Sequence, residues 1–318
     1  MLAREGLYEN VLRASSSTTE QLGVNVDGLA GVLCELGRVD RLAELGHNGP
    51  LLASGGAESL FHCLFGRDSI RMAMDLLDDF PAVARVTLLE LARLQGVRTD
   101  DRSEEEPGRI VHEFRHPDDP HTQRLVASGW AFPYYGTVDS TPQWVNLLAL
   151  YCARYGTAIL DIGVTDRRWR WIGVRDCLLA ALAWIVGRMD DGRGGGCVWV
   201  QRANPRGIAN QVWEDSADSH YYADGSLLDP SEPYAPVAVQ GYAYDALVHG
   251  AALLEASPGA LPFEAAWLRD RATRLRRRVL GEFWQPDLAA FAQALTFEPD
   301  GSPRACRVMA SSAFHLLE

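Results

Sequence analysis

Two neighbouring residues early in the chain could bind a polyol through paired donors and acceptors. Arg67 and Asp68 stand side by side in residues 64–70, where a helix is expected to begin. A guanidinium offers five N–H donors and a carboxylate two acceptor oxygens, so the pair can hold vicinal hydroxyls. The simpler alternative is that Asp68 or Ser69 caps the helix and Arg67 is a surface charge.

Polar residues alternate with apolar ones in residues 107–115. His112, Glu113 and Arg115 take the polar positions, beside Val111 and Phe114. The three are candidate substrate-binding residues. A short extended segment with a solvated face is the alternative.

Four aromatic side chains precede a carboxylate in residues 129–142, just before another expected helix. Aromatic faces stack on the C–H faces of sugar rings, and a nearby carboxylate accepts hydroxyl protons. We therefore select Tyr135 and Asp139 as candidate binding residues. The alternative is a hydrophobic wedge in which Asp139 or Ser140 caps the helix.

Two adjacent carboxylates follow a tryptophan in residues 207–219. Trp213, a further candidate binding residue, precedes Glu214 and Asp215. Like charges beside a desolvating ring raise a carboxyl pKa, as a general acid requires. The alternative is that the two carboxylates lie in the first turn of a helix, where the helix dipole favours acidic residues. Downstream, Gln240 and Tyr242 open a further helix as binding candidates, with ordinary core packing as the alternative.

The elements that must position these residues are mostly helical. Apolar residues recur at spacings of three and four in residues 26–45, 69–80, 82–95, 144–155, 174–189, 239–254 and 263–283. Two long polar connections, 98–133 and 190–234, separate helices, and loops of that length are usually functional. Strand signals are few: residues 197–201, and a hairpin at 289–297 with a turn at 299–302. The pattern predicts an all-α chain, either a solenoid or a closed toroid of helical hairpins.

Composition excludes several classes of function. The 318 residues include 42 acidic and 30 basic side chains, a net charge of −12, and none of the basic residues is Lys. No general attraction to nucleic acid or to anionic membranes is expected, and lysine-based catalysis is excluded. Six cysteines form no CxxC pair, so we expect buried thiols and neither a metal nor a cofactor. No signal peptide or membrane-spanning run is evident, which predicts a cytoplasmic protein.

Taken together and in order, these segments resemble a known family. Five segments are similar to the glycogen-debranching, amylo-α-1,6-glucosidase-like group. They are Phe-Gly-Arg-Asp-Ser at 65–69, Gly-Arg-Ile-Val-His-Glu-Phe-Arg at 108–115, Tyr-Tyr-Gly-Thr-Val-Asp-Ser-Thr-Pro at 134–142, Asn-Gln-Val-Trp-Glu-Asp-Ser at 210–216 and Val-Gln-Gly-Tyr-Ala-Tyr at 239–244. That group belongs to the glucoamylase-like (α/α)6 toroid glycosidases. The resemblance extends from about residue 54 to the end of the chain.

The resemblance implies a role for each matching residue. Arg67 and Asp68 would hold the terminal glucose, and Asp139 would belong to the aromatic-rich pocket loop. Asp215 matches the general acid of an inverting hydrolase, with Glu214 as the alternative, because glucoamylases also carry two acidic residues after this Trp. The implied substrate is an oligo- or polysaccharide with α-1,6 or α-1,4 linkages, and mannosylglycerate and trehalose are also compatible.

The length suggests that the expected toroid ends early. We divide the chain into an N-terminal helical segment, 1–53, and a catalytic domain, 54–318. A twelve-helix toroid needs about 400 residues at ordinary helix and loop lengths. We therefore expect the last helices and the general base to lie beyond residue 318. Uncovered apolar stripes would then favour a homo-oligomer. The alternative function is a non-catalytic glycan-binding or degenerate fragment.

Overall fold

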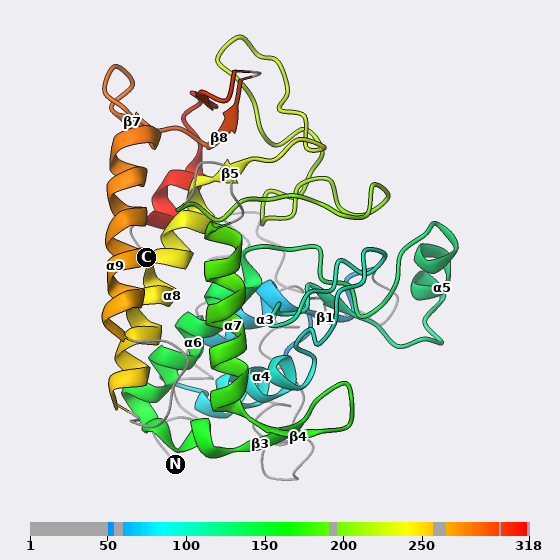
Figure 1. The fold of residues 1–318 in the computed structure, drawn as a ribbon. Helices are drawn as coiled ribbons and strands as arrows, with labels where there is room; N and C mark the ends of the chain where they lie inside the picture. Colours follow the sequence, from blue (N-terminus) through cyan, green and yellow to red (C-terminus); the bar gives the residue numbers. More distant parts are fainter. Residues whose placement is uncertain (1–49, 54–59, 191–195, 257–264, 299, 317–318) are drawn as a thin grey trace, which may run out of the picture. The chain divides into compact units, whose positions relative to one another are not determined.

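Long helices dominate the computed structural model (Figure 1). The structure describes residues 50–53, 60–190, 196–256, 265–298 and 300–316. The α-helices in these ranges are α3 (Gly66–Asp75), α4 (Pro81–Arg93), α5 (Pro120–Ala127), α6 (Ser140–Tyr155), α7 (Val174–Met189), α8 (Val237–Ala256) and α9 (Ala265–Arg278). A π-helical turn, Val279–Phe283, continues α9, and 3₁₀-helices span Thr157–Asp161 and Ser311–Leu316.

Helical periodicity located most of these helices. The prediction for residues 174–189 matches α7, and Pro81 occupies the first turn of α4, where its missing N–H costs nothing. Helix α5 was missed because it is a single short element inside a predicted loop; Asp119 caps it by accepting the His121 N–H at 2.8 Å. The helix expected at 26–45 lies outside the described residues.

Nine short strands pair within the described residues. They are β1 (Leu64–Phe65), β2 (Glu113–Phe114), β3 (Gly163–Thr165), β4 (Trp171–Gly173), β5 (Ala235–Pro236), β6 (Trp284–Gln285), β7 (Ala290–Phe291), β8 (Ala294–Phe297) and β9 (Pro303–Ala305). All pairs are antiparallel: β1 with β2, β3 with β4, β6 with β7, and a sheet in the order β5-β8-β9. The predicted hairpin at 289–297 is thus divided between β7 and β8, and the predicted turn at 299–302 falls between β8 and β9.

The fold class expected from the sequence was wrong. The structure is 46% helical and carries several small antiparallel sheets, a mixed α/β arrangement rather than an all-α (α/α)6 toroid. Strands of two to four residues leave little periodic signal, because partners remote in sequence fix their pairing. Two further expectations assumed the toroid: that its last helices are missing, and that a homo-oligomer covers the apolar surface left there. Neither has support from the mixed α/β fold.

Helix α8 lies at the centre of the helical packing. It packs against α6 and α9, while α3 packs against α4 and α6 (Figure 1). Buried residues occur on most faces of α8, as expected for a helix with neighbours on several sides. None of the described helices has both the length and the hydropathy to cross a membrane.

Two units divide the chain. One comprises residues 1–48 with 54–62, and the other residues 49–53 with 63–318. Only residues 60–62 of the first unit are described, so the predicted boundary at residue 53 and the helical segment before it stay predictions. All contacts discussed below lie within the second unit. Its cysteines, Cys63, Cys152, Cys177, Cys197 and Cys306, are buried free thiols, whereas Cys34 lies outside the described residues.

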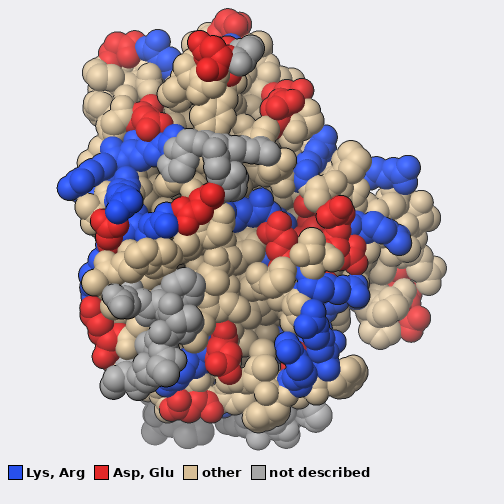
Figure 2. Space-filling model, in the orientation of Figure 1, with Lys and Arg blue, Asp and Glu red and all other residues tan. Residues whose placement is uncertain are grey.

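Acidic and basic side chains are interspersed on the face shown in Figure 2. Arginines stand beside aspartates and glutamates rather than forming one large patch of either sign. The exposed ion pairs of the second unit include Arg71 with Asp75 and Arg154 with Asp78. Exposed pairs of this kind contribute little stability each.

Candidate active site

Short main-chain pairings bring together the segments that carry the predicted site. Strand β1 pairs with β2 so that Phe65 opposes Glu113, and Glu113 also forms a bridge with Tyr134. The Val138 N–H donates to the Gln211 carbonyl at 2.8 Å. Four segments that are far apart in the sequence therefore meet at the N-terminal ends of α3 and α6.

Arg67 lies between three carboxylates there. Its Nε is 3.8 Å from Asp68 Oδ2, its Nη1 is 3.5 Å from Asp139 Oδ2, and its Nη2 is 3.6 Å from Asp215 Oδ2. Burial opposes the charge of Arg67, but the three carboxylates outweigh burial and raise the pKa of the guanidinium. We call these four residues the Arg67 cluster.

The three carboxylates of the cluster differ in exposure. Asp139 has no exposed side-chain surface, whereas Asp68 and Asp215 are 40% and 47% exposed. The Thr137 hydroxyl donates to the other oxygen of Asp139. Asp139 is thus a buried anchor, held also by the partial positive charge at the start of α6, while a solute can reach Asp68 and Asp215.

Several polar atoms of this region are buried without a hydrogen bond to any described residue. They are Arg67 Nη1, Asp68 Oδ2, Asp139 Oδ2 and His112 Nδ1. The ion pairs of Arg67 are longer than a hydrogen bond, and the His112 ring lies between the rings of Phe65 and Tyr134, with centroids 5.5 and 5.9 Å away. Buried polar atoms are nearly always hydrogen-bonded in native proteins, so these atoms are unusual. Of the residues that carry them, Asp68 and Arg67 keep exposed side-chain surface, 40% and 16%, where a polar ligand can bind.

His112 is uncharged in this setting. Burial, together with the positive charges of Arg67 and Arg109, lowers its pKa well below the usual range. The predicted binding residue therefore adds a neutral ring beside the Arg67 cluster rather than another cation.

Glu214 and Asp215 have different partners. Glu214 Oε1 accepts a hydrogen bond from Gln293 Nε2 at 3.1 Å, and Oε2 lies 3.5 Å from His220 Nε2. Burial raises the pKa of Glu214. Burial also raises the pKa of Asp215, where the charge of Arg67 opposes the shift and that of Asp139 adds to it. The sequence predicted that adjacent like charges and a neighbouring ring would raise the pKa values of these carboxyls. Burial is the largest cause for both, and the negative charge that raises the pKa of Asp215 is that of Asp139.

Trp213 and Tyr242 meet at one residue. Their ring centroids lie 5.2 and 5.6 Å from that of His315, both in edge-on arrangements. His315 thereby joins the loop that carries Glu214 to α8, a contact that the sequence analysis did not predict.

Glu113 and Arg115 form a buried ion pair. Arg115 Nε contacts Glu113, its Nη1 donates to Asp119 Oδ2 at 3.2 Å, and Cys63 Sγ lies 3.6 Å from Glu113 Oε1. Because Asp119 caps α5, the pair joins β2 to the start of that helix. These two residues were predicted to bind substrate, but their contacts in the structure stabilise the local fold.

Tyr135 and Gln240 also serve the scaffold. The Tyr135 hydroxyl donates to the Leu94 carbonyl at 2.6 Å and lies 2.8 Å from Arg167 Nη1. The Gln240 amide bonds both the N–H and the carbonyl of Val198 at 2.9 Å. Both side chains are fully buried, so they hold loops in place.

Arg109 is an organising residue that sequence reasoning missed. It is fully buried, and it donates to the carbonyls of Glu104 and Thr137 at 2.8 and 3.0 Å and to Gln211 Oε1 at 2.8 Å. It therefore fixes Thr137, the partner of Asp139, against the loop that carries Asp215. The sequence does not distinguish a buried arginine from an exposed one. The position of Arg109 within the 108–115 motif was the one signal that could have identified it.

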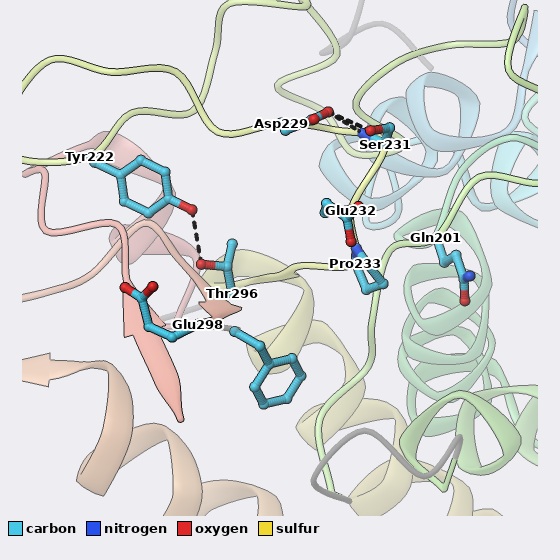
Figure 3. Close-up of a pocket in the computed structure, with 9 residues that line it drawn as sticks. Gln201, Tyr222, Asp229, Ser231, Glu232, Pro233, Thr296 and Glu298 are labelled. Atoms are coloured by element: carbon cyan, nitrogen blue, oxygen red, sulfur yellow. Dashed lines mark hydrogen bonds between the residues drawn. The ribbon is translucent and has the colours of Figure 1, made fainter. Parts of the chain in front are cut away.

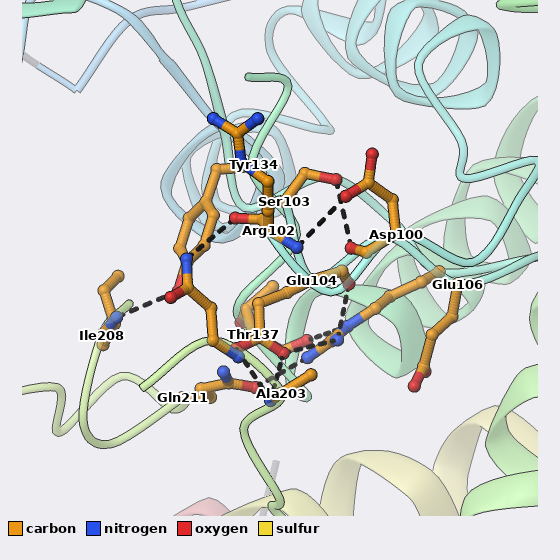
Figure 4. A network of polar contacts seen from close by, with 12 residues as sticks. Asp100, Arg102, Ser103, Glu104, Glu106, Tyr134, Thr137, Ala203, Ile208 and Gln211 are labelled. Atoms are coloured by element: carbon orange, nitrogen blue, oxygen red, sulfur yellow. Dashed lines mark hydrogen bonds and ion pairs between the residues drawn. The ribbon is translucent and has the colours of Figure 1, made fainter. Parts of the chain in front are cut away.

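The carboxylate of Glu104 completes the network around Arg109 (Figure 4). It accepts the main-chain N–H groups of Ala203 and Asn204 at 2.7–3.0 Å. Glu104 also has a positive φ of 58°, a strained value that persists only when its surroundings fix it. Arg109 and Glu104 thus tie the two long connections, which were predicted to be functional, to each other and to Thr137, the partner of Asp139.

A separate cavity of about 610 Å³ opens beside the β5-β8-β9 sheet (Figure 3). Tyr222, Thr296 and Glu298 lie on one side of it and Gln201 and Glu232 on the other. No member of the Arg67 cluster lines this cavity. It is therefore not the site that the sequence predicted.

The comparisons with known proteins leave the chain without a matching family: no family model matches it, and no curated protein is similar enough to match. Among the described residues, no group of three His, Cys, Asp or Glu side chains could hold a metal ion. Arg67 instead supplies the positive charge among the clustered aspartates.

Proposed function

We propose that this chain is a glycoside hydrolase of the glycogen-debranching type, which cleaves α-1,6- or α-1,4-glucosidic linkages at non-reducing ends of a cytoplasmic oligo- or polysaccharide. The Arg67 cluster carries the proposal. It combines donors and acceptors on one guanidinium and three carboxylates, and Arg67 Nη1, Asp68 Oδ2 and Asp139 Oδ2 have no hydrogen-bond partner among the described residues. Adjacent hydroxyls of a sugar match that arrangement.

In this proposal the cluster binds the terminal glucose. Arg67 donates to ring hydroxyls and Asp68 accepts from them, while buried Asp139 keeps the guanidinium oriented. The resemblance of residues 65–69 and 134–142 to the debranching group supports these assignments, and it is independent of the geometry.

Asp215 is the proposed general acid. Its pKa is raised by burial, which helps it to hold a proton, and its side chain is 47% exposed and can reach a glycosidic oxygen. As the C–O bond breaks, the proton passes from Asp215 to the leaving oxygen, and water attacks the anomeric carbon from the opposite face. A second carboxylate must take the proton of that water. Asp139 is unsuited to this role because it is fully buried and held by Thr137 and Arg67.

One observation favours a second candidate function, glycan binding without catalysis. The ion pair between Asp215 and Arg67 stabilises the ionised carboxylate, whereas a general acid must be protonated before the reaction. A chain with this pair but no base would bind sugars and not cleave them.

Glucose release from panose and maltooligosaccharides tests the proposal. We expect Asp215→Asn to lower turnover about 10²–10⁴-fold, the usual loss when a general acid is removed, with the melting temperature nearly unchanged. Glu214→Gln is the matched control, and it should keep most of the activity. The reverse result would make Glu214 the acid. A wild-type chain that binds the sugars and releases no glucose would favour the non-catalytic function.

A further inference from the structure

The hairpin formed by β3 and β4 exposes two tryptophans. Trp169 is 90% exposed and Trp171 76% exposed, although tryptophan is among the most apolar side chains and is usually well buried. Neither indole has a ring partner among the residues that the structure describes. The hairpin lies at the lower end of the unit in Figure 1, opposite the sheet that contains β5 and β8.

We infer that Trp169 and Trp171 form a second carbohydrate site, a platform on which a neutral α-glucan chain stacks. This inference rests on the proposed function for the choice of glucan. Indole faces stack on the C–H faces of pyranose rings, and a polymer bound here would stay close to the enzyme between cleavage events.

The backbone holds the platform in shape. Asp166 Oδ1 accepts the N–H groups of Arg168 and Arg170 at 2.8 Å, and its Oδ2 accepts Arg170 Nε at 2.8 Å. Trp169 has a φ of 61°, which is unfavourable for a bulky residue. The turn therefore holds the Trp169 side chain in solvent, although exposure of the apolar indole and the positive φ are both unfavourable. Such strain is expected at a binding residue.

Trp171 is positioned by a glycine on the paired strand. A Cβ added to Gly163 would fall 2.1 Å from Trp171 Cε2, so the indole lies directly against the bare backbone there. One side of the ring is thus supported, while most of its surface faces solvent. A side chain at residue 163 would displace the ring without removing it.

The charges beside the tryptophans favour a neutral ligand. Figure 2 shows arginines over this hairpin, but Arg167 Nη1 lies 2.6 Å from Glu105 Oε1, and Arg170 Nη2 lies 2.7 Å from Asp166 Oδ2. Arg168 donates to the Val97 carbonyl. Carboxylates offset the charges of Arg167 and Arg170, whereas the partner of Arg168 is an uncharged carbonyl. One uncompensated guanidinium among the three gives little attraction to an anionic lipid bilayer.

Native gel electrophoresis with amylose or glycogen in the gel tests the platform. The wild-type chain should be retarded, and W169A/W171A should weaken the apparent affinity about tenfold, since two stacking contacts of ordinary strength amount to that factor. Gly163→Ala should weaken it too, because it moves Trp171. Trp284→Ala, which removes a 39% exposed indole from the β6–β7 hairpin, is the matched control and should leave retardation unchanged.

The same variants separate this inference from the proposed function. Glucose release from panose should be unaffected in W169A/W171A, because panose is too short to need the platform. Retardation that depends on the tryptophans supports the platform even if no variant releases glucose. A wild-type chain that neither polymer retards, or equal retardation of wild type and W169A/W171A, would overturn it. So would tryptophan-dependent binding to phosphatidylserine vesicles in place of glucan.

Discussion

Arg67 is the residue on which the candidate site depends. One positive charge faces three aspartates, so the Arg67 cluster retains an excess of acceptor oxygens. Exposed surface remains on Asp68 and Asp215 but not on Asp139. The two half-exposed carboxylates are therefore the ones that a sugar can reach.

Asp68→Ala should abolish sugar binding while leaving the fold intact. Asp68 is 40% exposed, and its contact with Arg67 is the longest of the three, so its removal costs little stability. Calorimetric titration with glucose or acarbose should show binding to the wild-type chain and none to the variant. Arg71→Ala, which breaks an exposed ion pair one turn further along α3, should bind as the wild type does. Equal affinity in all three proteins would make Asp68 a structural residue.

Arg67→Met should destabilise the protein by about 3 kcal/mol, because it leaves the buried carboxylate of Asp139 without its counter-charge. Adding Asp139→Asn removes that uncompensated charge. The double variant should therefore lose less stability than the two single variants together. Urea denaturation of the four proteins measures the coupling, and strictly additive losses would mean that the two residues do not interact.

At the scale of elements, the start of α3 must touch the segment before β2. A Cβ at Gly66 would fall 2.0 Å from the Val111 carbonyl oxygen, so Gly66→Ala must separate the two and displace Arg67. We expect a loss of about 2 kcal/mol or more, typical of overpacking against backbone, and weaker sugar binding.

Gly187→Ala provides the control for Gly66→Ala. Gly187 lies within α7 with nothing within 4 Å of an added Cβ, so alanine should stabilise the helix by about 0.5–1 kcal/mol. Thermal melts and calorimetry of both variants measure the contrast. Equal stability of the two would show that the contact of Gly66 with residue 111 does not matter.

Sequence reasoning located the helices better than the sheets. Apolar residues at helical spacing identified α7 to the residue and α8 closely, since each helix is long enough to repeat its pattern. The pairing of β1 with β2 joins residues about fifty positions apart, and two-residue strands carry no period. The all-α expectation failed for that reason.

The candidate site was predicted in part. Arg67, Asp68, Asp139 and Asp215 came from motif chemistry, and the structure brings them together. Tyr135 and Gln240 have residue types that suit sugar binding, but burial commits them to internal hydrogen bonds. Sequence does not reveal which polar side chains are buried, so Arg109 and His220 were missed.

For the whole molecule, the two long connections form one polar network. Arg109 and Glu104 tie them together, and His220 and Gln293 both contact the carboxylate of Glu214. Stability should therefore depend on buried polar groups that titrate.

Acid should destabilise the protein partly through His220. This side chain is 1% exposed, and burial lowers its pKa to about 4. Between pH 6.5 and 4 the unfolded chain gains a proton at this residue and the folded chain does not, so stability falls as the pH falls. The contribution is at most about 3 kcal/mol.

His220→Gln provides the comparison for that pH dependence. Glutamine does not titrate, and its side-chain amide can still form a hydrogen bond with Ser219, whose hydroxyl lies 2.9 Å from His220 Nδ1. Urea denaturation at pH 7 and pH 4.5 should show a smaller pH-dependent loss in the variant than in the wild type. Identical losses would mean that His220 is not buried in its neutral form.

We propose that the Arg67 cluster belongs to an inverting α-glucosidase. Proton NMR of the first glucose released from panose or maltotriose tests this claim most directly. We predict that the wild-type chain releases β-glucose before mutarotation, and that Asp215→Asn releases none on the same timescale. Release of α-glucose, or no hydrolysis together with no sugar binding at the cluster, would contradict the account.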